Sequence, residues 1–451
     1  MFEQSIMPFF GAFGWLSIML LVGVALRAKI GLFQKFLFPA SILGGLLGFI
    51  LISVGWCNIP HETFTLFAIH FFTLNYISIG LTGTEAKPEK GSVQKMVIRG
   101  AFWMTLIFTC MVTTQMLIGT SMLYVTNTFS KPIFPGLGWL LGQGYALGPG
   151  QAVAMSSVWQ TTYNIPDAVS FGLTFAAVGF LIASLIGVPL ANWGIRKGLP
   201  VNAPAELPRE LLVGLHDEDT RADAGKLITH SANMDGMAFQ LAITIAVYFV
   251  TYYAASGLKA VLPGPVKPLA FGMMFFWGVI IALITKGILV KVGLGKYFDM
   301  NVQRRITGTS IDYMVVATLM AVKVGVIWAN ILPIVLICVL GGLFTFFFIF
   351  YFGRRLDQFG FERMIGIFGL CTGTAASGLL LLRIVDPQFK SPASLELGLM
   401  GLPLLLLMPL SFIGYTLPAF GVPKAMMLVA VLFVVALILL KILRYWKKPA
   451  W

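Results

Sequence analysis

The chain has 451 residues, of which 58% are hydrophobic and only 11% are charged. Soluble domains carry about 25% charged residues, so this composition excludes an ordinary soluble protein and indicates one that crosses a membrane many times. The net charge of +13 comes from basic residues that lie between apolar runs, which fits membrane topology and not a nucleic-acid partner. The four cysteines and four histidines are scattered, so we predict neither a disulfide framework nor a zinc site.

Apolar runs long enough to cross about 30 Å of hydrocarbon occur eleven times along the chain. They fall at residues 7–26, 37–57, 63–83, 99–125, 168–192, 237–257, 268–288, 309–329, 331–352, 394–416 and 424–444. Two further apolar stretches, 136–160 and 362–384, are interrupted by glycine. The fold class that we predict is an all-α membrane protein with about 11 transmembrane helices and two broken segments.

The distribution of Lys and Arg predicts the orientation in the membrane. If the N-terminus lies outside and neither broken stretch crosses, the outer loops keep only Lys131, Lys259, Lys267 and Lys424. The inner segments then receive Arg27, Lys29, Lys35, Lys87, Lys90, Lys95, Arg99, Arg196, Lys197, Lys286, Lys291, Lys296, Arg304, Arg305, Arg354, Arg355, Arg363, Lys441, Arg444, Lys447 and Lys448. A full crossing by either broken stretch would remove this bias. We therefore predict that both stretches are re-entrant and that the C-terminus is cytoplasmic.

The spans divide into two halves that resemble each other in outline. Residues 1–196 form a first repeat of five spans with the hairpin 136–160, and residues 236–416 form a second repeat with the hairpin 362–384. The proline-rich and acidic segment 197–235 reads as a cytoplasmic linker, and 417–451 adds a C-terminal span. Because five crossings invert the second half, we predict two inverted-topology repeats, the plan of secondary transporters.

The broken stretches are the candidate binding site. Irregular backbone at membrane depth is tolerated only inside protein or along a water-filled cavity, and glycine lets backbone groups approach a ligand closely. Helix N-termini attract carboxylates, and freed carbonyls and hydroxyls ligate sodium. Close helix packing through small residues is the alternative use of such glycines. The candidate substrate-binding residues at the two tips are Gly148, Gly150, Gln151, Thr372, Gly373 and Thr374, and Ser377 and Thr374 are candidate sodium ligands.

Few ionisable or amide side chains interrupt the apolar runs, so those that do are candidates too. Asp312 could ligate sodium or the amine of a substrate, or it could be an interfacial residue or a partner of Lys323. Arg383 could hold a substrate carboxylate bidentately, or anchor the helix end beside Asp386. Asn75 is a further candidate sodium ligand, with helix-to-helix hydrogen bonding as the alternative.

Catalytic chemistry has no support in the sequence. No His–acid pair accompanies a serine at a shared depth, and no phosphate-binding Gly-Lys-Ser/Thr motif occurs. We therefore predict that the protein is not an enzyme and does not use ATP by itself.

Four segments resemble the bacterial sodium:glutamate symporter family: FPASILGGLLG, AIHFFTLNYISIGL, GQGYALGPGQAVAMSSVW and GLCTGTAASGLLLLRIVDP. The resemblance covers roughly residues 12–415. In that family each half carries a glycine-rich re-entrant loop between its fourth and fifth spans. The first loop departs from the family pattern Ser-Gly-Gly-His-Gly-Thr-Gly, because the chain reads LGPGQAV with Gly150 at the histidine position. In the second loop Gly369, Cys371 and Gly373 match the pattern.

The resemblance implies a function and an assembly. We expect a sodium-coupled symporter for glutamate or a related anionic amino acid or carboxylate, which works as a homodimer in the cell inner membrane by an elevator-type movement. It implies no cofactor, and no metal other than sodium. Spans three to five and eight to ten, with the hairpins, would form the moving domain, and spans one, two, six and seven the scaffold. The alternatives are a proton-coupled or exchange carrier for another organic anion, and an ion channel.

Overall fold

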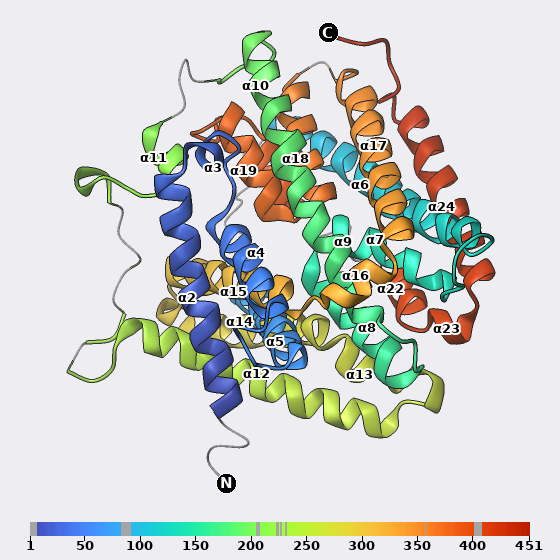
Figure 1. Ribbon diagram of the computed structural model, residues 1–451. Helices are drawn as coiled ribbons and strands as arrows, with labels where there is room; N and C mark the ends of the chain where they lie inside the picture. Colours follow the sequence, from blue (N-terminus) through green and yellow to red (C-terminus); the bar gives the residue numbers. More distant parts are fainter. Residues whose placement is uncertain are drawn as a thin grey trace. The chain divides into compact units, whose positions relative to one another are not determined.

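The computed structural model describes residues 7–82, 92–203, 208–221, 225, 228–230, 232–356, 358–400 and 408–451. Within these residues the ordered elements are helices and no strand occurs. In the described part of the chain eight helices have the length and apolarity needed to cross a membrane, and they begin at Pro8, His61, Lys95, Ala168, Gly236, Met274, Ile331 and Val422. The prediction of an all-α membrane protein is therefore confirmed (Figure 1).

The chain divides into two compact units, and each takes segments from both sequence halves. Unit 1 comprises residues 1–28, 39–85 and 214–321, and unit 2 comprises 29–38, 86–213 and 322–451. The units are therefore not the two predicted repeats themselves. They instead collect equivalent parts of each half: the early spans in unit 1, the late spans and both broken stretches in unit 2.

Unit 1 is built from long helices that pack around α5. Its elements are α2 (Met7–Lys29), α4 (Ala40–Ser53), α5 (His61–Thr82), η3 (Glu218–Thr220), α12 (Gly236–Val261), η4 (Gly264–Val266), α13 (Leu269–Gly272), α14 (Met274–Lys291), η5 (Leu294–Tyr297) and α15 (Met300–Ala321). Helices α14 and α15 pack on α5. On α15 the backbone carbonyl of the buried Gln303 accepts a hydrogen bond from Ser78 Oγ of α5 at 2.7 Å, and its side-chain Nε2 donates to Gln240 Oε1 of α12 at 3.2 Å. These bonds satisfy polar groups that burial would otherwise penalise.

Unit 2 holds the broken segments. Its elements are α3 (Gly31–Lys35), α6 (Ser92–Thr126), η1 (Pro135–Trp139), α7 (Leu140–Tyr145), α8 (Pro149–Thr162), α9 (Ala168–Ile182), the π-helical turn η2 (Ala183–Gly187), α10 (Val188–Arg196), α11 (Arg209–Val213), α16 (Val324–Ala329), α17 (Ile331–Gly353), α18 (Gly360–Thr372), α19 (Ala375–Val385), α20 (Ala393–Leu399), α22 (Met408–Tyr415), α23 (Leu417–Phe420) and α24 (Val422–Ile442). Helix α6 packs against η1, α7, α17 and α24.

Four predicted spans differ from the observed helices. The span 268–288 is divided into α13 and α14, with Met273 between them. The span 37–57 is a 14-residue helix, α4, because Pro39 sets its start. The span 309–329 is wrong as a single rod, since α15 ends at Ala321 and α16 starts again at Val324. The span 394–416 includes residues 401–407, which lie outside the described residues, so only its two ends, α20 and α22, can be compared.

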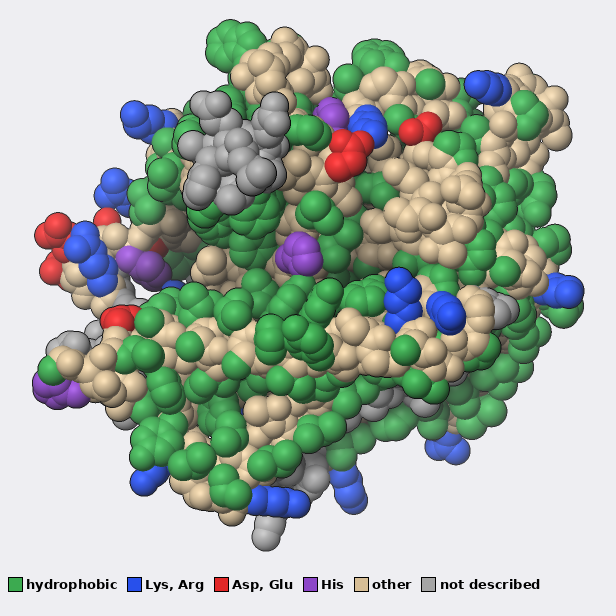
Figure 2. Space-filling model, turned by 90° about the horizontal axis from the view of Figure 1, so that it is seen from below, with side chains coloured by type: hydrophobic (Ala, Val, Ile, Leu, Met, Phe, Trp, Pro, Cys, Tyr) green, Lys and Arg blue, Asp and Glu red, His purple; other side chains and the backbone are tan. Residues whose placement is uncertain are grey.

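The surface has the apolar character that lipid contact requires. Figure 2 shows a face on which hydrophobic side chains cover broad areas, while charged side chains stand singly or in small groups. On α24 the exposed side chains include Met427, Val431 and Val435, and on α12 they include Phe249 and Tyr253. Such a contiguous apolar exterior is what a bilayer-embedded protein presents.

Candidate functional site

Both glycine-broken stretches fold as two helices separated by a short break. In the first, α7 ends at Tyr145 and α8 begins at Pro149. Gly148 lies before Pro149 with φ +84°, a left-handed conformation that glycine adopts without strain. In the second, α18 ends at Thr372 and α19 begins at Ala375, with extended backbone at Thr374.

The second stretch, which we call hairpin 2 (α18 and α19), reverses direction tightly. A Cβ added at Gly378 of α19 would lie only 2.6 Å from the carbonyl oxygen of Gly366 on α18. The two ends also lie together at residues that follow α10. The backbone N–H of Val201 donates to Glu362 at the start of α18 at 2.7 Å, and Asn202 lines one pocket with Asp386 and Lys390 beyond the end of α19.

The first stretch, hairpin 1 (η1, α7 and α8), has its ends together as well. Phe134, just before η1, meets Trp159 near the end of α8 edge-on, with ring centroids 6.2 Å apart. Trp159 Nε1 donates to the carbonyl oxygen of Gly414 at 2.9 Å. Gly414 also lies against Trp139 of η1, so both arms start from one place beside α22.

The two hairpins approach the middle of α6 from opposite ends. Glu396, which pairs with Arg363 at the base of hairpin 2, lies against Gly100 near the start of α6. Further along, Gln115 donates to the Cys371 carbonyl near the tip of hairpin 2 at 3.0 Å. Hairpin 1 begins near the other end of α6, where Gly138 lies against Gly119.

The tips of the two hairpins are in contact. A Cβ at Gly148 would lie 2.7 Å from Thr374 Cγ2 and 3.5 Å from the Gly373 carbonyl oxygen. Gly148 and Thr374 are the N-cap residues of α8 and α19. The positive ends of two helix dipoles therefore converge, and the first-turn N–H groups of both helices have no partner within their own helix.

The hydroxyl groups at the tips differ in their hydrogen bonding. Thr374 makes no side-chain capping bond, and its Oγ1 is buried without a hydrogen-bond partner among the described residues. Ser377 is buried and its Oγ lies against Gly373. Thr372 donates to the Phe368 carbonyl of its own helix at 2.8 Å. Gly150 and Gln151 are buried in the first turn of α8. Of the predicted tip residues, Gly148 of hairpin 1 therefore lies against Gly373 and Thr374 of hairpin 2. The role of the tip residues in binding stays a prediction.

Arg383 does not join these residues. It lies in the last turn of α19, is exposed and stands over the ring of Phe389 at 5.3 Å. Nine residues of helix separate it from Thr374, about 13 Å at 1.5 Å per residue. The prediction that Arg383 and the tip amides hold the same carboxylate is therefore wrong. Its alternative, an anchor at the helix end, agrees with its position.

Asn75 and Asp312 lie in unit 1, on α5 and α15. Asn75 is buried and its Oδ1 has no partner in the described part of the chain, whereas the side chain of Asp312 is exposed. The helices that carry them, predicted spans three and eight, pack on α4 and α14 of unit 1. The predicted grouping of these spans with the hairpins in one domain is therefore wrong, because their partners are the spans of the predicted scaffold.

Three further polar side chains lie near the tips, and two of them, Tyr145 and Gln143, were not predicted from the sequence. Tyr145 donates from its hydroxyl to the Cys338 carbonyl on α17 at 3.0 Å. Gln143 on α7 is buried, with its Oε1 unpartnered among the described residues. Gln115 bonds Thr345 as well as Cys371. The available signal was a polar side chain inside an apolar run, which Gln115 and Gln143 both give.

The chain matches one family of known proteins. The family model described as sodium/glutamate symporter matches residues 11–359. The matched range contains hairpin 1 and ends just before hairpin 2. No curated protein matches the chain.

Proposed function

Because the chain belongs to the sodium/glutamate symporter family, we propose that it moves glutamate or a related anionic amino acid or carboxylate across the membrane together with sodium. We further propose that substrate and ion bind where the hairpin tips meet. The observation that carries this proposal is the contact between Gly148 and Thr374, the N-caps of two separate helices.

The substrate carboxylate is assigned to backbone groups. No Asp, Glu, Lys or Arg occurs between residues 136 and 160 or between 364 and 382, so the tips themselves hold no formal charge. Two converging helix N-termini supply positive potential without one. The donors would be the N–H groups of Gly150, Gln151 and the first turn of α19, with Thr372 and Gly373 beside them.

Sodium is assigned to oxygen ligands of hairpin 2. Thr374 Oγ1 is buried and unpartnered among the described residues, and an unpaired buried hydroxyl is costly unless a ligand completes it. Ser377 and the carbonyl groups freed at the break would complete the set, since sodium is a hard cation that prefers oxygen. Asn75 and Asp312 form a separate proposal for a sodium site in unit 1, where Asn75 Oδ1 also lacks a described partner.

The membrane arrangement is part of the proposal. Hairpins 1 and 2 would be re-entrant from opposite faces, which the meeting of each hairpin's own two ends supports. Eleven crossings in two inverted repeats, an outside N-terminus and a cytoplasmic C-terminus in the cell inner membrane would follow. Elevator movement would displace unit 2, which holds both hairpins, against unit 1, and a homodimer would supply a fixed frame.

Uptake of labelled glutamate and a panel of dicarboxylic acids into proteoliposomes tests the function. We expect saturable uptake that requires a sodium gradient and is lost in Ser377→Ala with the fold intact. Asp312→Asn tests the unit 1 site separately. Uptake that ignores sodium and follows a pH gradient would replace symport with proton coupling, and unitary currents without saturation would indicate a channel. Full activity in Ser377→Ala would remove Ser377 from the site.

A further inference from the structure

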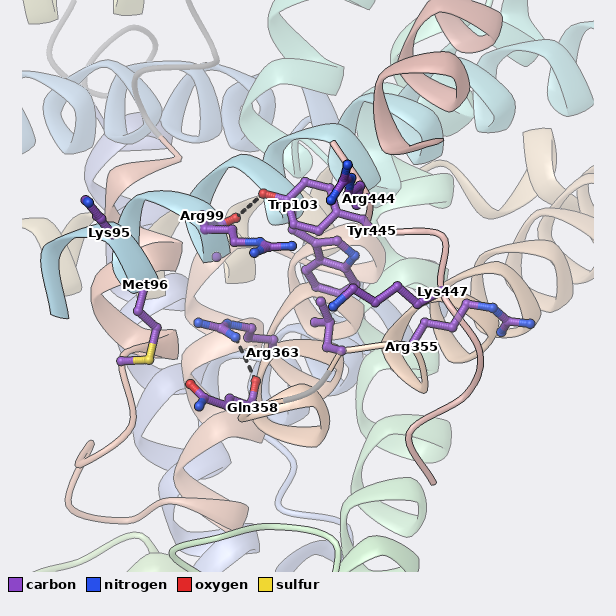
Figure 3. Close-up of a pocket in the computed structure, with 12 residues that line it drawn as sticks. Lys95, Met96, Arg99, Trp103, Arg355, Gln358, Arg363, Arg444, Tyr445 and Lys447 are labelled. Atoms are coloured by element: carbon purple, nitrogen blue, oxygen red, sulfur yellow. Dashed lines mark hydrogen bonds between the residues drawn. The ribbon is translucent and has the colours of Figure 1, made fainter. Parts of the chain in front are cut away.

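A second polar pocket lies in unit 2, at the base of hairpin 2. It has a volume of about 340 Å³, within the range of about 300–1,000 Å³ found for small-molecule sites. Three segments far apart in the sequence form it: the start of α6, the connection from α17 to α18, and the residues after α24 (Figure 3).

The pocket lining is strongly basic. Its six basic side chains are Lys95, Arg99, Arg355, Arg363, Arg444 and Lys447. Figure 3 shows Arg99 and Lys447 directed toward the space between the three segments, with Lys95 and Arg444 at its margin. No acidic residue occurs among the described lining residues. Even if Glu396 and the neighbouring Asp357, which lies outside the described residues, are both counted, basic charges exceed acidic ones by four.

Arg363 and Tyr445 hold the segments of the pocket in place. Arg363 forms a two-point ion pair with Glu396, at 2.7 Å from Nε and 2.6 Å from Nη2, and donates to the Gln358 carbonyl. Tyr445 donates to the carbonyl oxygen of Arg99 at 2.6 Å, and the Arg99 guanidinium stands 5.5 Å from its ring. Burial raises the pKa of the Tyr445 hydroxyl, so this hydroxyl remains a donor and ties the C-terminal segment to α6.

Two buried donors in the lining have no hydrogen-bond partner among the residues that the structure describes. Trp103 is fully buried, and its Nε1 has no hydrogen-bond partner among the described residues; the same holds for Arg355 Nε. Buried N–H groups are rarely left unpaired. Their presence beside an excess of positive charge indicates a missing acceptor, and an anion supplies one.

The position of the pocket narrows the class of anion. Lys95 begins the apolar part of α6, and Arg444 to Lys447 directly follow α24, which ends at Ile442. The pocket therefore lies at the ends of two membrane-spanning helices that pack together, and Met96, Leu356 and Trp103 give it an apolar side. Basic pockets between the ends of transmembrane helices are typical sites for anionic lipid headgroups.

We propose that this pocket binds the phosphate-bearing headgroup of an anionic phospholipid, with Arg99 and Lys447 as the main contacts. The phosphate oxygens would accept hydrogen bonds from these side chains and from Trp103 Nε1, and the glycerol and first acyl carbons would lie against Met96 and Leu356. The bound lipid would hold the C-terminal segment, the start of α6 and the base of hairpin 2 together. This assignment does not depend on which substrate the protein transports.

Native mass spectrometry of the full-length protein tests the proposal, with phosphatidylglycerol, phosphatidylcholine or inorganic phosphate as probes. We expect the wild type to retain phosphatidylglycerol in preference to phosphatidylcholine. The double substitution Arg99→Gln/Lys447→Gln should weaken phosphatidylglycerol binding by about thirtyfold, since each basic group near a membrane surface contributes about fivefold. The matched control Lys441→Gln/Lys448→Gln removes the same charge from exposed positions that do not line the pocket, and should bind as the wild type does.

Three outcomes would overturn the proposal. One is equal retention of phosphatidylglycerol by the wild type and Arg99→Gln/Lys447→Gln. Another is an equal loss in both double variants, which would mean a general effect of surface charge. The third is displacement of lipid by inorganic phosphate at equal concentration, which would assign the pocket to a soluble phosphate compound. If Arg99→Gln/Lys447→Gln does not fold, Lys95→Gln/Arg444→Gln at the pocket margin provides the same comparison, with a smaller expected loss of about tenfold.

Discussion

Hairpins 1 and 2 place a helix N-terminus at the same spot but are held there by different means. The arms of hairpin 2 touch each other at Gly366 and Gly378, and a buried ion pair from Arg363 to Glu396 of α20 fixes its base. Hairpin 1 relies on its neighbours, since Gly138 packs on α6 and Trp159 bonds to α22.

The tips differ in chemistry as well. Hairpin 2 carries three hydroxyl side chains around its break, at Thr372, Thr374 and Ser377, whereas hairpin 1 offers Gly148, Pro149 and Gly150. The difference teaches that the two arms of a pseudo-symmetric site need not share one task. In the proposed site, hairpin 2 would provide the oxygen ligands, and hairpin 1 would provide backbone donors and a close approach to the substrate. Substitutions at each base and each tip can separate these tasks.

The largest effect is expected at the base of hairpin 2. In Glu396→Ala the Arg363 guanidinium stays buried without its partner, so we expect a loss of about 3–5 kcal/mol in unfolding free energy. Denaturant titration of the purified protein in detergent measures it. The double variant Glu396→Leu/Arg363→Met should recover most of the loss, because an apolar pair of similar volume avoids desolvating two charges. A double variant as unstable as the single one would contradict this account.

At the tip, Thr374→Val should separate stability from sodium binding. The substitution keeps the shape and removes a buried hydroxyl that has no described partner, so without sodium the thermal midpoint should stay level or rise. The wild type should gain about 2.7 kcal/mol at a sodium concentration one hundred times its dissociation constant, and the variant should lose most of this gain. Thermal unfolding in sodium and in choline buffers measures both. An undiminished sodium response in Thr374→Val would exclude Thr374 as a ligand.

Contact between the arms of hairpin 2 predicts an intermediate effect. Gly378→Ala places a methyl group 2.6 Å from the Gly366 carbonyl oxygen, so the arms must separate, at about 1–3 kcal/mol. Gly398→Ala on α20 is the control, because nothing lies within 4 Å of its added Cβ. Unfolding midpoints of the two variants give the comparison. Ala is a better helix former than Gly, so helix propensity by itself would stabilise both variants. A Gly398→Ala protein as unstable as Gly378→Ala would therefore show that contact between the arms is not the cause of the loss.

The sequence predicted the hairpins because glycine clusters in an apolar run have few physical explanations. Residues 95–99, 355–363 and 444–447 were all assigned to inner loops by charge, and these segments line one pocket. The side of the membrane on which they lie stays a prediction. The local pattern therefore predicted the breaks in the helices, and the binding role of the residues at the breaks stays a prediction.

The sequence did not predict which helices pack together when they lie far apart in the chain. Arg383 was predicted to bind the substrate with the tip because a guanidinium can hold a carboxylate bidentately. In the structure the length of α19 separates Arg383 from the tip. Spans three and eight were grouped with the hairpins, although the bond between Ser78 and Gln303 ties them to each other within unit 1. Neither the direction of a helix nor its partner follows from its own hydrophobic pattern.

The smallest predicted effect concerns the base of hairpin 1, where the chain offers a matched pair. Trp159 and Trp139 are both fully buried near Gly414, but only Trp159 Nε1 has a described hydrogen-bond partner. Trp159→Phe and Trp139→Phe remove the same volume, so the difference between their unfolding free energies isolates one hydrogen bond. We expect Trp159→Phe to be less stable than Trp139→Phe by about 1 kcal/mol. Equal losses would mean that aromatic packing alone holds this base, which would make the contrast with the ion-paired base of hairpin 2 still sharper.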